Sequence, residues 1–183
     1  MTKIVMILTF VLAFNFISFG QTNKKGTTKN AETSKVEVDT SVIAIMKLDN
    51  STNNFLGIFK SFRPTELTSN DLEKIETILL NFTKDYNREL KKLYEKLRAK
   101  FPDSDEFSEL NFIIELSRYR RQYYAITNEK GEKEVWINCF CHSWGENWRK
   151  ELIFVFDGGN CYFNLKINLE TGKYYDVRVN GEA

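Results

Sequence analysis

The sequence has no excess of charge and only one histidine, and each shortage excludes a class of function. Lysine and arginine number 26 against 25 acidic residues, for a formal net charge of +1. A nucleic-acid-binding domain usually carries a basic excess on its folded part, so we expect no nucleic-acid partner. The lone histidine, His142, limits histidine-based catalysis to one position. No glycine-rich segment opens a predicted helix, which excludes a phosphate-binding loop of the nucleotide-binding type.

Residues 1–20 have the three-part layout of a secretory signal peptide. A short positive start containing Lys3 precedes an apolar run from Ile4 to Phe19, and small residues stand before a cut at Gln21. The apolar run of about 16 residues is shorter than the roughly 20 that a spanning helix needs. We therefore expect cleavage, no membrane span afterwards, and a mature protein in the periplasm or outside the cell.

The rest of the chain divides into a polar linker and one domain. Residues 21–41 contain no aromatic residue, so they bury too little apolar surface to offset the entropy of ordering. We expect a flexible linker over 21–41 and a single domain over 42–183, a length that suits one core. Residues 42–46 form a short apolar run that is typical of a buried strand.

A long amphipathic helix is the clearest predicted element. Thr68 is a candidate N-cap, and Asp71 stands three residues on, as in a capping box. From Leu72 onward, apolar residues recur every three or four positions and form one stripe. An unbroken helix over residues 69–100 would be about 48 Å long, which exceeds the dimensions expected of such a domain. We therefore expect a break or bend near residues 85–87.

Two turns organise the C-terminal residues into predicted strands. Asp157-Gly158-Gly159-Asn160 is typical of a two-residue hairpin loop, which would pair residues 151–157 with 160–166. This register sets Phe154 opposite Phe163 and Phe156 opposite Cys161 on one apolar face. A second turn with Gly172 in a left-handed conformation then sets Phe163 opposite Val179, Leu165 opposite Val177 and Ile167 opposite Tyr175.

Residues 119–127 and 133–141 form another predicted hairpin, for which two registers remain open. Both registers separate the residues of the second strand in the same way: Val135, Ile137, Cys139 and Cys141 lie on one face, and Trp136, Asn138 and Phe140 on the other. The sequence thus predicts an α+β fold, with the long helix on one face of an antiparallel meander of about four or five strands. This architecture resembles the cystatin-like and nuclear-transport-factor-like folds.

The cysteines pose a separate question. Cys139, Cys141 and His142 form a C-F-C-H cluster, but strand alternation sends Cys141 and His142 to opposite faces, which argues against a metal site. In a simple meander, residues 151–157 would lie between the strands that carry Cys141 and Cys161. Two strand spacings of about 9.6 Å exceed the roughly 7 Å limit for a disulfide. We therefore expect reduced thiols; a bridge from Cys161 to Cys139 or Cys141 would mean a different strand order.

Aromatic residues supply the candidate binding site. Trp144 and Trp148 precede the predicted strand at 151–157, and Tyr162 faces away from the predicted core. Exposed tryptophan and tyrosine often mark binding surfaces, so these three residues are predicted to contact a ligand. In the alternative, the tryptophans plug an open end of the sheet, or residues 42–66 cover its second face. The sequence indicates no catalytic residue, no metal ligand and no cofactor.

The C-terminal sequence DGGNCYFNLKINLETGKYYDVRVNGEA (residues 157–183) resembles the end of a family of small exported bacterial proteins of unknown function. Residues 119–123 and 133–138 also resemble that family, and residues 166–173 are similar to a hairpin of PepSY-type envelope domains. The resemblance implies export and a bacterial source, and it implies no activity.

Three functions follow as hypotheses. The first is a non-enzymatic binding module of the cell envelope, with a protein or small-molecule ligand. The second, by analogy with the cystatin-like architecture, is an inhibitor or regulator of an envelope protease. The third, an enzyme, would require a buried polar group in a concave site between the helix and the sheet.

Overall fold

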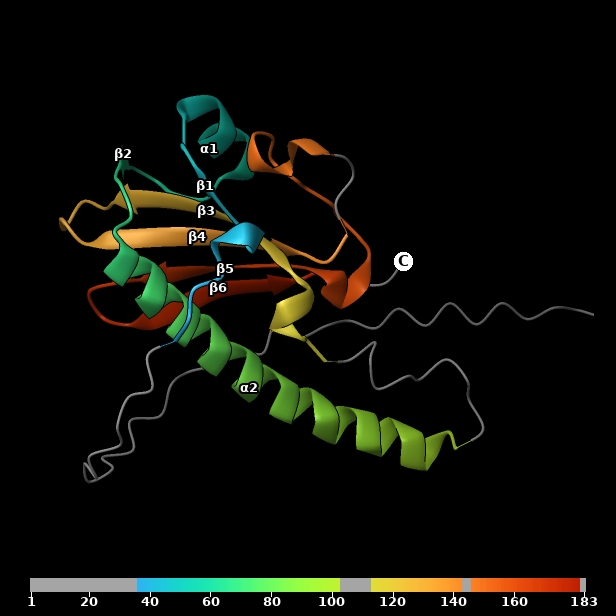
Figure 1. The fold of residues 1–183 in the computed structure, drawn as a ribbon. Helices are drawn as coiled ribbons and strands as arrows, with labels where there is room; N and C mark the ends of the chain where they lie inside the picture. The colour runs from blue at the N-terminus through green and yellow to red at the C-terminus, as the bar shows by residue number, and fades with distance from the viewer. Residues whose placement is uncertain (1–35, 103–112, 143–145, 182–183) are drawn as a thin grey trace, which may run out of the picture. The chain divides into compact units, whose positions relative to one another are not determined.

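The computed structural model describes residues 36–102, 113–142 and 146–181, which belong to one unit of residues 34–183 (Figure 1). The regular elements follow one another as β1 (Ile43–Met46), α1 (Asn50–Leu56), β2 (Arg63–Pro64), α2 (Ser69–Lys100), β3 (Arg120–Thr127), β4 (Lys133–Phe140), β5 (Tyr162–Asn168) and β6 (Lys173–Val179). Short 3-10 turns cover Thr40–Val42, Leu116–Arg118, Glu146–Arg149 and Gly159–Cys161. The fold is α+β, as the sequence predicts. Within the described residues, no helix is both long and apolar enough to cross a membrane.

The sheet has six strands and is mixed. Its order is β1-β3-β4-β5-β6, and the two-residue β2 also pairs with β3. The neighbours from β3 to β6 are antiparallel, whereas β1 runs parallel to β3. The expectation of a wholly antiparallel meander is therefore wrong. The long connection from β1 to β3, which includes α2, provides the crossover that a parallel pair requires.

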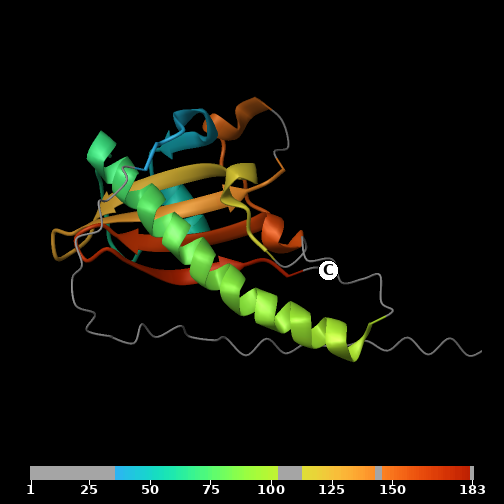
Figure 2. The same cartoon turned by 60° about the horizontal axis from the view of Figure 1, so that its bottom comes forward.

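Helix α2 begins at the predicted residue and lacks the predicted bend. Thr68 and Asp71 form a complete capping box, in which Thr68 Oγ1 accepts from the Asp71 N–H and Asp71 accepts from the Thr68 N–H. The helix then runs unbroken for 32 residues, so the predicted bend near residues 85–87 is wrong. No proline or glycine interrupts it. Its buried residues end at Thr83, and the C-terminal half extends beyond the strands (Figure 2).

The predicted strand at 151–157 is not part of the sheet. Strand β4 pairs directly with β5, with Ile137 opposite Leu165 and Cys139 opposite Phe163. Gly158 and Gly159 have positive φ, as the predicted hairpin turn requires, but they lead into the 3-10 turn before β5. The predicted pairing of Phe154 with Phe163 is therefore wrong. Residues 150–157 have no regular structure and instead cross the face of the sheet that lies opposite α2.

The remaining register predictions are partly correct. Phe163 pairs with Val179 and Gly172 adopts a φ of 67°, both as predicted. A bulge between Asn164 and Lys166 shifts the later pairs by one residue, so Ile167 lies opposite Tyr174. Asp176, the only described non-glycine residue with positive φ, lies on β6 at this irregularity.

Each face of the sheet carries its own apolar cluster, and Figure 1 shows α2 on one side and α1 on the other. We call the sheet surface under α2 the α2 face and the opposite surface the second face. The main core lies on the α2 face and includes Ile75, Leu79, Phe82, Val135, Ile137, Cys139, Phe163 and Leu165. Trp136 and Phe140 face the second side, where α1, residues 58–62 and residues 146–153 cover them. The predicted division of β4 between two faces is confirmed.

Candidate functional site

Side-chain amides hold residues 147–157 against the second face of the sheet. The Gln122 amide, fully buried on β3, donates to the carbonyls of Trp148 at 2.7 Å and Glu151 at 2.6 Å and accepts from the Ile153 N–H at 3.1 Å. Asn138 on β4 donates to the carbonyl of Ile153 at 2.6 Å. These amides replace the ladder hydrogen bonds that the segment would have as a strand.

Asn180, just after β6, extends the same arrangement. Its amide donates to the carbonyl of Val155 at 2.6 Å and to the carbonyl of Asp157 at 2.9 Å. The backbone of residues 153–157 is therefore fixed at both ends, by Asn138 on β4 and by Asn180 after β6. The aromatic side chains of this stretch are held in place although the stretch has no regular structure.

A groove of about 250 Å³ lies between this stretch and the sheet. Residues 56–58 at the end of α1 and residues 154–156 form its walls, and outward side chains of β4, β5 and β6 form its floor. On the floor, the indole Nε1 of Trp136 donates to Asn164 Oδ1 at 3.2 Å. The groove thus combines an aromatic wall with a polar floor, a composition typical of binding sites.

Three solvent-exposed phenylalanines form a continuous rim beside the groove. Phe154 contacts Phe55 with ring centroids 5.6 Å apart and Phe156 with centroids 5.0 Å apart. The exposed fractions are 67% for Phe55, 38% for Phe154 and 84% for Phe156. A phenylalanine as exposed as Phe156 gains little from folding, so an apolar group of this size facing water indicates an interaction surface.

The charges on the floor are not balanced within the groove. Lys166 forms an ion pair with Asp176 at 2.7 Å, and its ammonium also lies 5.1 Å from the centroid of the Phe59 ring. Arg178 lies opposite Asn164 on the neighbouring strand, and its guanidinium has no carboxylate partner among the residues that the structure describes. Among the described residues that line the groove, Arg178 is therefore the cation without a carboxylate partner, and it lies next to the aromatic wall.

The three predicted ligand-contacting residues have different positions. Tyr162 lines the groove at the start of β5, as a binding role requires. Trp148 is only 6% exposed; it packs on Phe140 and lies 4.3 Å under the guanidinium of Arg149, so it offers little surface to a ligand. Trp144 lies outside the described residues.

The sequence reasoning missed the groove because it assigned residues 151–157 to a strand. Leu152, Phe154 and Phe156 alternate as they would in a buried strand, which placed both phenylalanines in the core. A signal for the correct arrangement was present in the strands themselves. Gln122 and Asn138 stand in strand interiors, where a buried amide must find partners.

A buried charged pair lies elsewhere, under α2. Glu76 of α2 forms an ion pair with Arg121 of β3 at 3.3 Å, and both side chains are almost fully buried. Tyr123 donates its hydroxyl to Glu76, and Arg121 donates to the carbonyl of Leu116 at 3.1 Å. None of these side chains lines the groove. The pair supplies the buried polar group that an enzyme hypothesis requires, and it lines neither of the two pockets found among the described residues.

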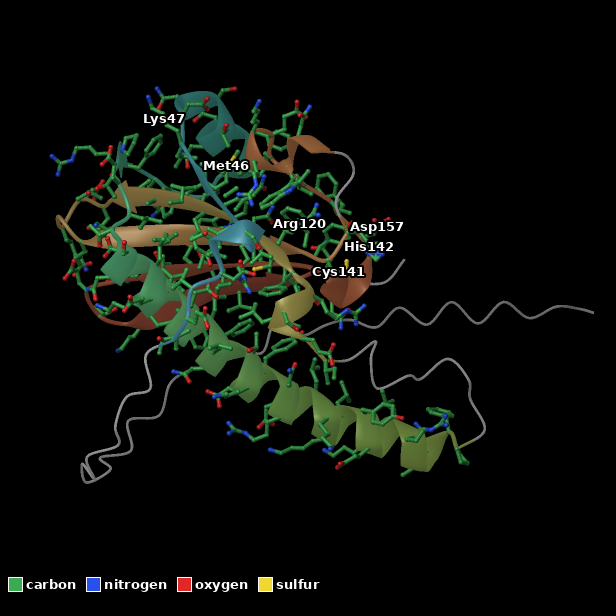
Figure 3. All side chains as sticks on the ribbon, in the orientation of Figure 1. Met46, Lys47, Arg120, Cys141, His142 and Asp157 are labelled. Atoms are coloured by element: carbon green, nitrogen blue, oxygen red, sulfur yellow. A yellow bond between two sulfur atoms is a disulfide. The ribbon has the colours of Figure 1, made fainter. Side chains whose placement is uncertain are left out.

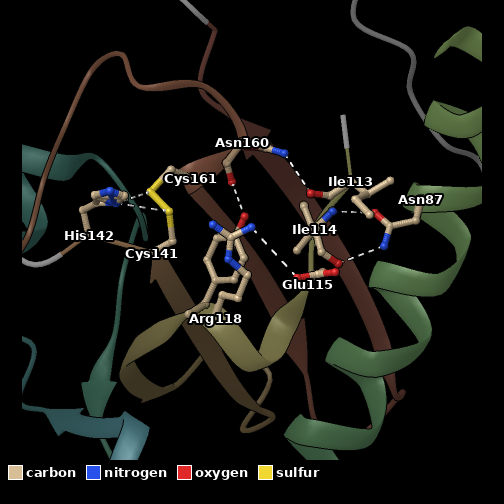
Figure 4. A network of polar contacts seen from close by, with 10 residues as sticks. Asn87, Ile113, Ile114, Glu115, Arg118, Cys141, His142, Asn160 and Cys161 are labelled. Carbon is tan, nitrogen blue, oxygen red and sulfur yellow. Dashed lines mark hydrogen bonds and ion pairs between the residues drawn. A yellow bond between two sulfur atoms is a disulfide. The ribbon is translucent and has the colours of Figure 1, made fainter. Parts of the chain in front are cut away.

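The cysteines differ from both sequence predictions. Cys141 and Cys161 form a disulfide, and Cys139 is the free, buried thiol. The prediction of three reduced thiols is wrong because β4 and β5 are direct neighbours. The separation of Cys141 and His142 by strand alternation is also wrong, because β4 ends at Phe140. His142 turns its Nδ1 toward both sulfurs, at 3.5 Å from Cys141 and 3.6 Å from Cys161 (Figure 4).

The disulfide and His142 lie at the end of the sheet where β3 begins and β4 ends. Figure 3 places Arg120, Cys141 and His142 at this end. The groove and the disulfide are connected through the chain, because residues 154–156, which form one wall of the groove, lie in the sequence between Cys141 and Cys161.

Comparisons with known proteins give no family for this chain. No protein-family model matches the sequence. No curated protein and no solved structure matches it either. The geometry described above is therefore the basis for any proposal about function.

Proposed function

We propose that the protein is a non-enzymatic binding module, and that its groove receives a segment of a partner protein carrying an apolar side chain beside an acidic one. The observation that carries this proposal is the juxtaposition of the exposed ring of Phe156 with the available guanidinium of Arg178 in one groove. Aromatic residues and arginine are also the residue types that most often dominate binding energy at protein interfaces.

The size of the groove favours a protein partner over a free small molecule. Small-molecule sites usually enclose about 300–1,000 Å³, whereas this groove has about 250 Å³. A volume at or below the low end suits one or two anchoring side chains. The rim of Phe55, Phe154 and Phe156 extends the apolar surface outside the groove, where the body of a partner would rest.

The arginine on the floor of the groove favours an acidic group on the partner. A planar guanidinium binds a carboxylate through paired hydrogen bonds, which favours an aspartate, a glutamate or a chain terminus. Lys166 is already engaged by Asp176, so Arg178 is the cation that a partner carboxylate would meet. The apolar anchor would pack on Phe156 and Tyr162, and the carboxylate would lie over β6.

The cellular setting of the module is also a proposal. The signal-peptide pattern of residues 1–20 and the resemblance to small exported bacterial proteins both support a protein of the cell envelope. A long helix across one face of a sheet supports the cystatin-like or nuclear-transport-factor-like comparison at the level of architecture. The inhibitor of an envelope protease therefore remains the alternative function, with Phe156 as the exposed wedge.

Selection from a phage-displayed library of random peptides tests the proposal. We expect enriched peptides to place an acidic residue near an aromatic or large aliphatic one, and to bind the mature protein measurably by fluorescence anisotropy. Phe156→Ser and Arg178→Ala should each weaken binding by about tenfold, a size typical of an interface anchor.

Two matched substitutions outside the groove provide the controls. Ile45→Ser removes another exposed apolar side chain, and Arg63→Ala removes another exposed arginine. Equal binding by all four variants would contradict the proposal, as would enriched peptides without acidic residues. Inhibition of a secreted protease that Phe156→Ser abolishes would instead support the alternative function.

A further inference from the structure

The backbone holds Cys141 and Cys161 together independently of their sulfur–sulfur bond. The two cysteines extend the β4–β5 ladder by one position, since Phe140 lies opposite Tyr162. The Cys141 N–H donates to the Cys161 carbonyl at 2.9 Å, and the two Cα atoms are 5.0 Å apart. Reduction of the disulfide removes one bond from an otherwise intact pair of strands. The two thiols would therefore stay adjacent after reduction.

His142 completes a set of three metal-binding atoms. The two sulfurs and the imidazole Nδ1 all lie within 4.8 Å of one another. In a tetrahedral zinc site, Zn–S distances of about 2.3 Å and Zn–N distances of about 2.1 Å put sulfur and nitrogen about 3.6 Å apart. The observed distances from Nδ1 are 3.5 Å and 3.6 Å. The imidazole already has the spacing from both sulfurs that a shared zinc ion requires.

Only the sulfurs would have to move. In the same tetrahedral geometry, two thiolates on one zinc lie about 3.8 Å apart, a separation that becomes possible once the disulfide is broken. Side-chain rotation at the two cysteines supplies this movement without a change in the ladder. The fourth position would be open to water or to a ligand, because His142 is exposed and both cysteines are only half-buried.

We propose that Cys141, Cys161 and His142 form a redox-gated zinc site: the disulfide excludes the metal, and the reduced pair binds Zn²⁺ through two thiolates and one imidazole. Two thiolates with an imidazole and an open position are a ligand set that zinc accepts. Cys139, although close in sequence, does not belong to the site. It is fully buried in the main core.

A thiol or a phosphine can supply the electrons that reduce the disulfide. Reduction adds two electrons and two protons to the disulfide and yields two thiols, while the reductant becomes a disulfide or a phosphine oxide. Zinc then displaces one proton from each thiol, and both protons go to solvent. The zinc ion would connect the same two residues that the disulfide connects. Residues 142–160 would thus stay closed at their base in either state.

The experiment compares the intact protein before and after reduction with a phosphine. Isothermal titration with Zn²⁺ should show one ion bound per reduced chain and none per oxidised chain. Titration with Co²⁺ should give the thiolate-to-cobalt charge-transfer absorption and the visible bands of a tetrahedral site. Circular dichroism should show the same sheet content before and after reduction.

The variants separate the proposed site from adventitious binding. His142→Ala should weaken Zn²⁺ binding to the reduced chain by at least about tenfold. Cys161→Ser should reduce the charge-transfer band, and the double variant Cys141→Ser with Cys161→Ser should abolish it. Cys139→Ala, which removes the remaining thiol, should leave both signals unchanged.

Two outcomes would overturn the inference. One is Zn²⁺ binding to the reduced chain that is no tighter than binding to the double variant Cys141→Ser and Cys161→Ser. The other is loss of sheet structure on reduction, because the β4–β5 ladder must hold the two thiols side by side. Neither result bears on the groove, which is tested by peptide binding.

Discussion

The two faces of the sheet are covered by different means. On the α2 face, a regular helix satisfies its own backbone, so it meets the sheet mainly through apolar side chains. On the second face, residues 150–157 have no regular structure, and their backbone groups bond to Gln122, Asn138 and the neighbouring Asn180. An irregular covering segment therefore needs polar side chains on the sheet beneath it. A regular helix does not.

Each face also has one feature that departs from the way the rest of that face is covered. These two features give the sharpest tests of the difference between the faces. The apolar α2 face contains the buried ion pair of Glu76 and Arg121. The hydrogen-bonded second face exposes the apolar rim of Phe55, Phe154 and Phe156. The first feature concerns stability, and the second supports the proposed binding role.

Removing one member of the buried ion pair should destabilise the protein most. Glu76→Ala leaves the Arg121 guanidinium buried without its carboxylate, a change that typically lowers the free energy of unfolding by about 3–5 kcal/mol. It also removes the acceptor of the Tyr123 hydroxyl. Urea denaturation, followed by circular dichroism, measures the loss.

The double variant Glu76→Leu with Arg121→Met decides whether the charges themselves stabilise the fold. Replacement of both partners by apolar residues of similar size is often neutral, so most of the lost stability should return. Glu89→Ala provides the control on the same helix, because its ion pair with Lys92 is exposed and should contribute less than about 0.5 kcal/mol. A single-variant loss as small as the control would show that the α2 face is held by apolar contact alone.

Local sequence patterns predicted the start of α2 and the buried side of β4 on the α2 face. The capping residues Thr68 and Asp71, and the alternation of Val135, Ile137 and Cys139 along β4, are local patterns with a direct structural consequence. The bend expected near residues 85–87 is absent for a physical reason. Beyond Thr83 the helix buries no residue in the described structure, but ion pairs such as Asp85–Arg88 and the lack of a helix breaker allow it to continue.

The second face was not accessible to the same reasoning. Alternating apolar residues at 152, 154 and 156 suit a strand, and which strand lies next to β4 depends on long-range pairing rather than on local pattern. That one error also produced the wrong prediction for the cysteines, because direct pairing of β4 with β5 is what places Cys141 beside Cys161. The candidate groove depends on the same arrangement. It could therefore not be found from the sequence without first solving the strand order.

Loss of the Gln122 hydrogen bonds on the second face should give the next largest loss of stability. Gln122→Leu keeps the side-chain volume but leaves the carbonyls of Trp148 and Glu151 and the Ile153 N–H without their partner. Unsatisfied buried groups cost about 1–3 kcal/mol each, so we expect a loss of about 3 kcal/mol in the free energy of unfolding. Limited proteolysis should also cut residues 147–157 faster.

A hydrophobic exchange on the α2 face is the matched control for Gln122→Leu. Ile137→Leu changes the shape of a fully buried core residue and should cost less than about 1.5 kcal/mol. If Gln122→Leu costs no more than Ile137→Leu, or leaves the proteolysis rate unchanged, then the amide contacts do not hold the segment. The two faces would then not differ in the way their covering segments are held.

The smallest expected loss of unfolding free energy comes from the ionisation of buried tyrosines at alkaline pH. It should be similar for the tyrosine on each face of the sheet. Burial raises the pKa of Tyr119, on the α2 face, and that of Tyr124, on the second face, from 10.0 to about 12. The neutral phenol is the protonated form, so a raised folded pKa stabilises the fold fully below pH 10. This stabilisation is lost as the pH rises from about 10 to about 12, because the unfolded chain ionises first. At pH 11 each tyrosine should account for about 1 kcal/mol of the loss.

Urea denaturation at a series of pH values from neutral to alkaline separates the two tyrosines. Tyr119→Phe and Tyr124→Phe should each make the decline in unfolding free energy above pH 10 shallower. Tyr119 donates its hydroxyl to the Asn160 carbonyl at 2.7 Å, so Tyr119→Phe should also lower stability at neutral pH. An unchanged slope in Tyr124→Phe alone would mean that its phenol reaches water through the second face, whose cover would then be looser than that of the α2 face.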